Sequence, residues 1–209
     1  MTRRVLLLAI MALALVTVSG CIGGGEARPP VDQEAIKAAI GTVIDGFEEA
    51  VEAYDVDGML ACLPGEGFKL TLQEGGYSYT KDFATLESEL AEDEENQLAW
   101  RKPADEGGWG YALDLVLGTQ TFSNITATGA IVTQTHEVYE SSTKLGIDRL
   151  KTDNGTITWH FAKISGEWKA TAMTIAFEPV SMAAGTPRAT STARRPCFGF
   201  GYGAPNLRR

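Results

Sequence analysis

The sequence has 209 residues and a formal net charge of −9, and its 27 acidic side chains all lie between Glu26 and Glu178. That span holds only 11 of the 18 basic side chains, so it carries a net charge of −16. Such an acidic stretch argues against nucleic-acid binding, which needs a basic face, and against direct binding to anionic lipid head groups. About 150 residues remain for one domain with its own hydrophobic core.

Residues 1–20 have the pattern of a secretory signal peptide. Arg3 and Arg4 precede an apolar run at residues 5–16, which is too short to cross a bilayer core comfortably. The following Val-Ser-Gly-Cys at residues 18–21 resembles the lipobox of bacterial and archaeal lipoproteins. In that motif an aliphatic residue and two small residues precede the cysteine that is lipidated. The alternative is an ordinary signal peptide with a chance cysteine.

The lipobox resemblance implies that a lipid on Cys21 anchors the protein at the outer face of the cytoplasmic membrane. Residues 21–31 are then predicted to be a flexible tether, because their glycines and prolines cannot build a packed element. The nine residues from Ile22 to Pro30 reach at most about 30 Å. The folded domain is therefore expected close to that membrane.

Residues 32–54 have the apolar spacing of an amphipathic helix, with Asp32 as its N-cap. Asp55 predicts the start of a second short helix, which Pro64 and Gly65 end. The apolar side chains of the first helix recur at three- and four-residue steps: Ile36, Ile40, Val43, Ile44, Phe47, Val51 and Tyr54.

The next segments predict one strand and a third helix. Residues 67–74 alternate apolar and polar side chains, which is the pattern of a strand. The third helix is predicted from Asp82 to about Gln97. An acidic run at residues 91–96 is interpreted as a solvated helix face rather than a metal site.

From Trp109 onward the apolar side chains recur with a period of two, which predicts a sheet. Asn154-Gly155 and Ser165-Gly166 are each typical of a tight hairpin turn, so the sheet is expected to be an antiparallel meander. Helices followed by strands predict an α+β fold, in which the N-terminal helices pack on one face of a strongly curved antiparallel sheet. The strands are predicted near residues 109–118, 121–127, 129–140, 144–151, 155–164 and 167–177.

Two stretches resemble the nuclear transport factor 2-like (NTF2-like) domains. AIGTVIDGFEEAVEAYDVDGMLACL, from residue 39, resembles their opening helix pair, and DNGTITWHFAKISGEWKATAMTIAF, from residue 153, resembles their closing strands. The resemblance implies a cone-shaped domain over residues 32–178, with a pocket at its wide end. It does not choose a function, because this superfamily holds ketosteroid isomerases, SnoaL-like cyclases and dehydratases as well as non-catalytic members.

The catalytic members place a carboxylate or a His–Asp pair in the cone, so the two histidines are the catalytic candidates. His136 and His160 both lie on predicted strands. If Trp159 faces the core, His160 faces solvent; if the cone opens on the polar face, both histidines line it. The sequence leaves open which face of each strand points into the cone.

Tyr54, Trp109, His136 and Trp159 are the candidates for lining a pocket, although aromatic side chains at such positions also build cores. No Cys/His spacing suits zinc and no phosphate-binding motif is present, so no metal or cofactor is expected. Of the cysteines after the leader, Cys62 is predicted to be a buried free thiol, and a disulfide with Cys197 is the less favoured alternative.

Residues 179–209 contain five arginines and no acidic residue, and their composition predicts a disordered basic tail. For the domain itself three functions stay open. The first is a non-catalytic module that binds a small apolar ligand or a protein partner. The second is a small cyclase or isomerase that uses a His–carboxylate pair. The third is a structural subunit that forms a homodimer through its sheet.

Overall fold

The computed structural model describes residues 31–179 of the chain. The predicted signal peptide, Cys21, the tether as far as residue 30 and the tail from residue 180, with Cys197, lie outside the described residues. Within residues 31–179, no helix is both long enough and apolar enough to cross a membrane.

Helices α1 (Gln33–Ala53) and α2 (Val56–Ala61) begin at the two predicted caps. The Asp32 carboxylate accepts a hydrogen bond from the Ala35 amide at 3.1 Å, and that of Asp55 accepts from the Gly58 amide at 3.0 Å. These bonds satisfy amides that the first turn of a helix leaves without a partner. Asp55 therefore has a structural role at the start of α2.

The predicted strand is β1 (Lys69–Glu74), and it forms a hairpin with β2 (Tyr77–Asp82), which the sequence pattern did not reveal. Most side chains of β2 are exposed, so it lacks the apolar alternation by which strands are recognised. Gly75 and Gly76 have φ angles of 55° and 87°, which a tight turn requires and glycine adopts without strain. Helix α3 (Phe83–Arg101) follows, and a short 3₁₀ helix, η1 (Ala104–Glu106), comes after it.

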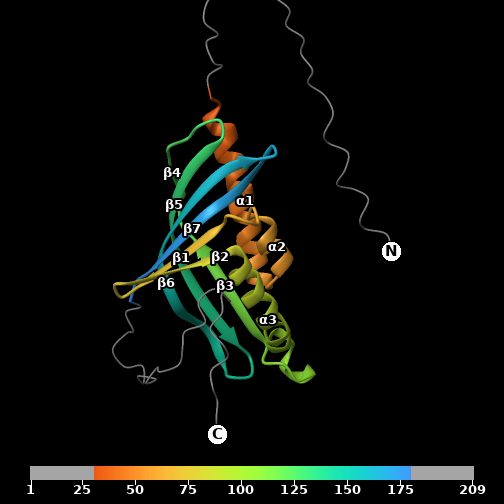
Figure 1. Cartoon of the computed structure of the whole chain (residues 1–209). Coiled ribbons are helices and arrows are strands. Elements are labelled where there is room, and N and C mark those ends of the chain that lie inside the picture. Colours follow the sequence, from red (N-terminus) through yellow and green to blue (C-terminus); the bar gives the residue numbers. More distant parts are fainter. Residues whose placement is uncertain (1–30, 180–209) are drawn as a thin grey trace, which may run out of the picture. The chain divides into compact units, whose positions relative to one another are not determined.

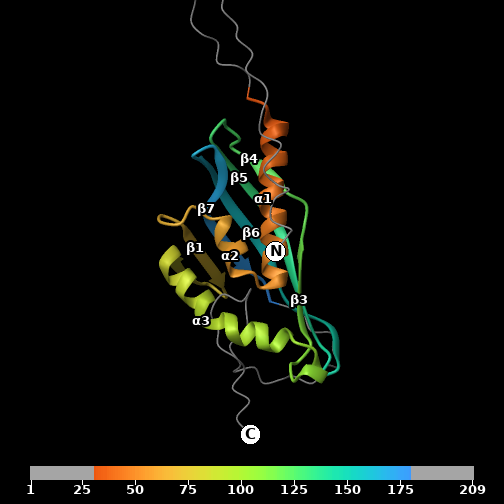
Figure 2. The same ribbon diagram turned by 90° about the vertical axis from the view of Figure 1, so that its right-hand side faces the viewer.

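The remaining strands are β3 (Tyr111–Leu117), β4 (Thr121–Ser123), β5 (Gly129–Ser142), β6 (Ile147–Ile164) and β7 (Glu167–Phe177). Their order in the sheet is β2-β1-β7-β6-β5-β3, and β4 also pairs with β5. The pairs are antiparallel except β1 with β7, which is parallel, so the expectation of a wholly antiparallel sheet is wrong at this one pair. The curved sheet wraps around α1 (Figure 1), and the helices lie over one of its faces (Figure 2).

Asn154-Gly155 does not form the predicted hairpin, because the two strands expected around it are one strand, β6. Gly155 pairs with His136 on β5 and with Phe177 on β7. A Cβ atom at Gly155 would lie 1.9 Å from the Ala176 carbonyl oxygen. The glycine therefore permits a close approach of two backbones rather than a turn.

The hairpin predicted at Ser165-Gly166 is confirmed, with φ angles of 52° and 92° between β6 and β7. The core lies between α1 and the sheet: the rings of Phe47 and Trp159 meet edge to face at 5.2 Å, and both residues are buried. Helices packed on a curved sheet confirm the predicted α+β class.

Candidate functional site

The inner face of the sheet is the face that packs against the helices. A histidine lies inside the domain if its side chain is on that face. On β5 every second side chain from Val132 to Val138 is buried, and this set includes Gln134, 3% exposed, and His136, 1% exposed. On β6 Trp159 is buried and His160, on the opposite face, is exposed. His136 is therefore inside the domain and His160 is outside.

Gln134 is a buried polar residue on this inner face. Its amide nitrogen and oxygen are both buried, and neither has a hydrogen-bond partner among residues 31–179. The same holds for Nε1 of Trp159, which lies on the neighbouring strand β6. A buried polar group without a partner costs about 1–3 kcal/mol, and native structures contain few of them. Three such atoms on two adjacent strands mark a candidate contact surface for a ligand.

His136 lies on β5 two residues from Gln134, on the same face. Its ring meets the ring of Phe177 edge to face, with centroids 5.8 Å apart. Burial lowers the pKa of His136 to about 4, and the positive charge of Lys151 contributes to that lowering. At neutral pH the imidazole is therefore uncharged, and it has one donor and one acceptor nitrogen.

A carboxylate lies on the same face as His136. Val138 pairs with Asp153 and His136 pairs with Gly155, so Asp153 is the diagonal neighbour of His136 across β5 and β6. Asp153 is 3% exposed and accepts a hydrogen bond from the Asn154 amide at 2.8 Å. The sequence pattern placed Asp153 in a turn, and so it missed this juxtaposition.

Glu140 is a second inward-facing carboxyl on β5, and the sequence pattern missed it too. Burial raises the pKa of Glu140, hydrogen bonding with Tyr111 and Thr152 opposes that effect, and the charge of Asp153 adds to it. The Oε1 atom of Glu140 is buried, and within the described part of the chain it has no hydrogen-bond partner. The inner face of β5 thus carries three polar side chains, Gln134, His136 and Glu140.

Tyr54 belongs to a polar cluster where the ends of α1 and α3 meet. Its hydroxyl donates to Oδ2 of Asp93 at 3.4 Å, and Gln97 donates to the same oxygen at 2.9 Å. The Arg101 guanidinium lies over the rings of Tyr54 and Tyr111, at 5.7 and 5.8 Å, and donates to a carbonyl oxygen in the last turn of α1. Burial and the charge of Asp93 raise the pKa of Tyr54. This cluster joins the two helices.

The other predicted positions lie apart from these groups. Trp109 is half-buried, and the Lys144 ammonium lies 4.9 Å from its ring centroid. Cys62 is a half-buried free thiol whose pKa is raised by burial. Within residues 31–179, no three His, Cys, Asp or Glu side chains come close enough together to hold a metal ion.

No protein-family model matches the sequence, and no curated protein matches it significantly. Solved structures match its fold at low sequence identity. An NTF2-like protein with a cystatin-like fold from Novosphingobium aromaticivorans has 16% identity and a TM-score of 0.52, over 73% of this chain and 88% of that one. A hexachlorocyclohexane dehydrochlorinase, LinA-type3, from Novosphingobium barchaimii has 13% identity and a TM-score of 0.51, over 74% and 94%.

A single-residue variant of Rv3472 from Mycobacterium tuberculosis, a protein of unknown function, has 11% identity and a TM-score of 0.53, over 75% of this chain and 87% of that one. The chain therefore has the cystatin-like, NTF2-like cone fold that its sequence resembles. Because these structures include both an enzyme and a protein of unknown function, the fold does not choose between catalysis and binding.

Proposed function

We propose that residues 32–178 form a domain that binds a small molecule without transforming it, and that a lipid on Cys21 holds this domain at the outer face of the cytoplasmic membrane. The observation that carries the proposal is Gln134, whose buried amide has no hydrogen-bond partner within the described residues on either of its polar atoms. A ligand that bonds both atoms would recover the free energy that their burial costs.

The chemistry of the inner face defines the ligand class. Gln134 offers one donor group and one acceptor, and Nε1 of Trp159 offers a further donor. The surrounding core is apolar, and the carboxyls of Asp153 and Glu140 on the same face disfavour an anion. The ligand that fits is an uncharged, mainly apolar molecule with an amide, hydroxyl or ketone group.

The decisive experiment is native mass spectrometry of the full-length protein after exposure to an extract of its own cells. The protein should carry a small molecule that the Gln134→Leu variant loses. Gln73→Leu, at an exposed position of β1, is the matched control and should keep the molecule. Repeated recovery of an empty wild-type protein contradicts the proposal.

The membrane location rests on the lipobox alone and has its own test. Replacement of Cys21 by Ser removes the thiol that a diacylglyceryl group needs. Metabolic labelling with a tagged fatty acid should mark the wild-type protein and leave Cys21→Ser unlabelled. Equal labelling of the two proteins would refute the assignment.

The second candidate function is acid–base catalysis of the cyclase or isomerase type, and the diagonal placement of His136 and Asp153 favours it. In this reaction the neutral imidazole would take a proton from the ligand while Asp153 orients the ring. His136→Gln should then abolish conversion of the recovered ligand and preserve its binding. If wild type and His136→Gln both return the molecule unchanged, the protein is a binding module.

A further inference from the structure

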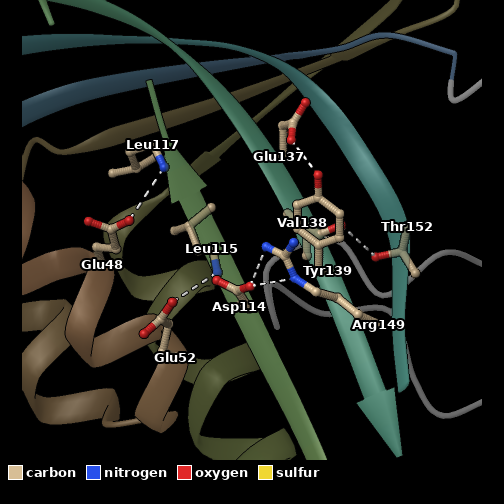
Figure 3. Close-up of polar contacts among 10 residues, drawn as sticks. All are labelled: Glu48, Glu52, Asp114, Leu115, Leu117, Glu137, Val138, Tyr139, Arg149 and Thr152. Carbon is tan, nitrogen blue, oxygen red and sulfur yellow. Dashed lines mark hydrogen bonds and ion pairs between the residues drawn. The ribbon is translucent and has the colours of Figure 1, made fainter. Parts of the chain in front are cut away.

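Strand β3 is at an edge of the sheet, so the amides on its free side need partners outside the sheet. Two of them find partners on α1. The Leu115 amide donates to Oε1 of Glu52 at 3.0 Å, and the Leu117 amide donates to Oε1 of Glu48 at 3.4 Å. Figure 3 shows both carboxylates pointing from the helix to the strand. We call these two hydrogen bonds the α1–β3 latch.

The latch depends on matched spacings. Glu48 and Glu52 are one helical turn apart, which is about 6 Å along α1. Leu115 and Leu117 are two strand residues apart, which is about 7 Å along β3. Two carboxylates of a helix can therefore bond two successive outward amides of a strand. The latch occupies positions that a further strand would otherwise fill.

The latch lies beside the candidate site. Leu117 pairs with His136 and Leu115 pairs with Val138, so the two latched residues are the neighbours of the inward-facing part of β5. Adjacent strands are about 4.8 Å apart. A gap between α1 and β3 would therefore be only one strand spacing away from the polar inner face of β5.

We propose that the α1–β3 latch is the gate of the domain interior: when its two hydrogen bonds break, α1 and the β3 edge separate and a small molecule reaches His136 and Gln134 between them. The identity of that molecule as a ligand rests on the proposed function. The opening itself does not, because it is a property of the empty protein.

Low pH favours the closed state of the gate, because Glu48 is protonated more readily in that state. Burial raises the pKa of Glu48, and the charges of Glu52 and Asp45 on α1 and of Asp114 on β3 raise it further, while the bond from Leu117 lowers it. In the open state Glu48 is solvated and its pKa is nearer the ordinary value. The closed state therefore binds a proton more tightly than the open state, and rising pH favours opening.

The two histidines of the chain provide the test, because one is buried at the gate and the other is exposed. Diethyl pyrocarbonate is a small reagent that modifies neutral imidazoles, and peptide mass spectrometry separates the two sites. We expect Glu48→Ala combined with Glu52→Ala to raise the modification rate of His136 about tenfold, since two hydrogen bonds are lost. The rate at His160 should not change, and Glu34→Ala, an exposed position in the first turn of the same helix, should match wild type.

Glu48→Gln is the second variant, and it keeps an acceptor oxygen while it removes the charge. At pH 7 it should label His136 no faster than wild type, even if the double alanine variant does not fold. Amide hydrogen exchange of wild type should show Leu115 and Leu117 better protected at pH 5 than at pH 8, after correction for intrinsic rates. A rate at His136 that is unchanged in the double alanine variant, or raised in Glu48→Gln, overturns the gate. Loss of ligand recovery alone overturns only the binding function.

Discussion

The two faces of the sheet are made by alternate residues of the same strands, yet polar side chains have different surroundings on each face. On the outer face six threonines form one row across six strands, because each pairs with the next in register. In sheet order they are Thr121, Thr133, Thr158, Thr174, Thr71 and Thr80. Two pairs are within hydrogen-bond distance, Thr133 with Thr158 at 3.5 Å and Thr71 with Thr80 at 3.1 Å.

The outer face also carries charged side chains of β3, β5 and β6. Arg149 lies 3.7 Å from the ring centroid of Tyr139 and forms an ion pair with Asp114 at 2.6 Å. Lys151 and Tyr139 both donate to the Glu137 carboxylate at 2.5 Å, and Figure 3 shows the bond from Tyr139. None of these side chains is buried, so their polar atoms are satisfied at little net gain or cost.

On the inner face the same strands hold Gln134 and Trp159, whose polar atoms water does not reach. A polar side chain there costs stability unless something bonds it. The buried polar groups that could bind a ligand are therefore on the inner face of the sheet.

Trp159→Ala should lower the free energy of unfolding by about 3–5 kcal/mol, because it removes a large buried ring that packs on Phe47 and Phe161. His160→Ala, the next residue on the outer face, should change it by less than about 0.5 kcal/mol. Urea unfolding measures both. Similar effects at the two positions would mean that the inner and outer faces are wrongly assigned.

His136 should make the domain less stable in acid. Its pKa is about 4 in the folded protein and near 6.5 when unfolded, so the unfolded chain binds the proton more readily. Stability should therefore fall by up to roughly 3 kcal/mol between pH 6.5 and pH 4, with no further loss from this group below pH 4. The difference in unfolding free energy between wild type and His136→Gln isolates this contribution. His160→Gln should keep the wild-type pH dependence.

Gln134→Leu should raise the free energy of unfolding of the empty protein by about 1–2 kcal/mol, since an apolar side chain of similar size needs no partner. The exposed Gln73→Leu should change it by less than about 0.5 kcal/mol. Thermal or urea unfolding in the absence of extract gives the comparison. A loss of stability in Gln134→Leu would show that the amide is already bonded in the native protein.

Thr158→Ala, in the outer row, should cost only about 0.2–1 kcal/mol, which is the contribution of a cross-strand pair. The same row allows a test of the proposed homodimer. If two copies pair through it, Thr158→Arg should convert a dimer to a monomer in light scattering after size-exclusion chromatography. A molecular mass that is the same in both proteins would exclude pairing through this row.

Most of the fold was predictable because it depends on local signals. The apolar stripe of α1, the caps Asp32 and Asp55 and the turn at Ser165-Gly166 each act within a few residues, and the structure has all of them. Strand β2 was missed because its exposed side chains carry no apolar period. The turn predicted at Gly155 was wrong because the glycine meets Ala176, a residue far along the chain.

The candidate site was only partly predictable. His136 was named from the sequence, but nothing in its neighbourhood showed whether it or His160 lies inside. Gln134 is two residues from His136, so strand alternation puts both on one face, yet no local pattern says that a glutamine will be buried without a partner. Asp153 and the carboxyls of the α1–β3 latch became visible only when strands and helix were placed side by side.

The α+β class, the helix caps and the alternation of the strands were predictable from short windows of sequence, because they follow from side-chain period and capping chemistry. Three features came from the three-dimensional arrangement: the inner face of each strand, the carboxylate diagonal to His136 and the sheet edge that α1 covers. Those depend on contacts between residues far apart in the chain, and a strand's two faces differ only in what packs against them.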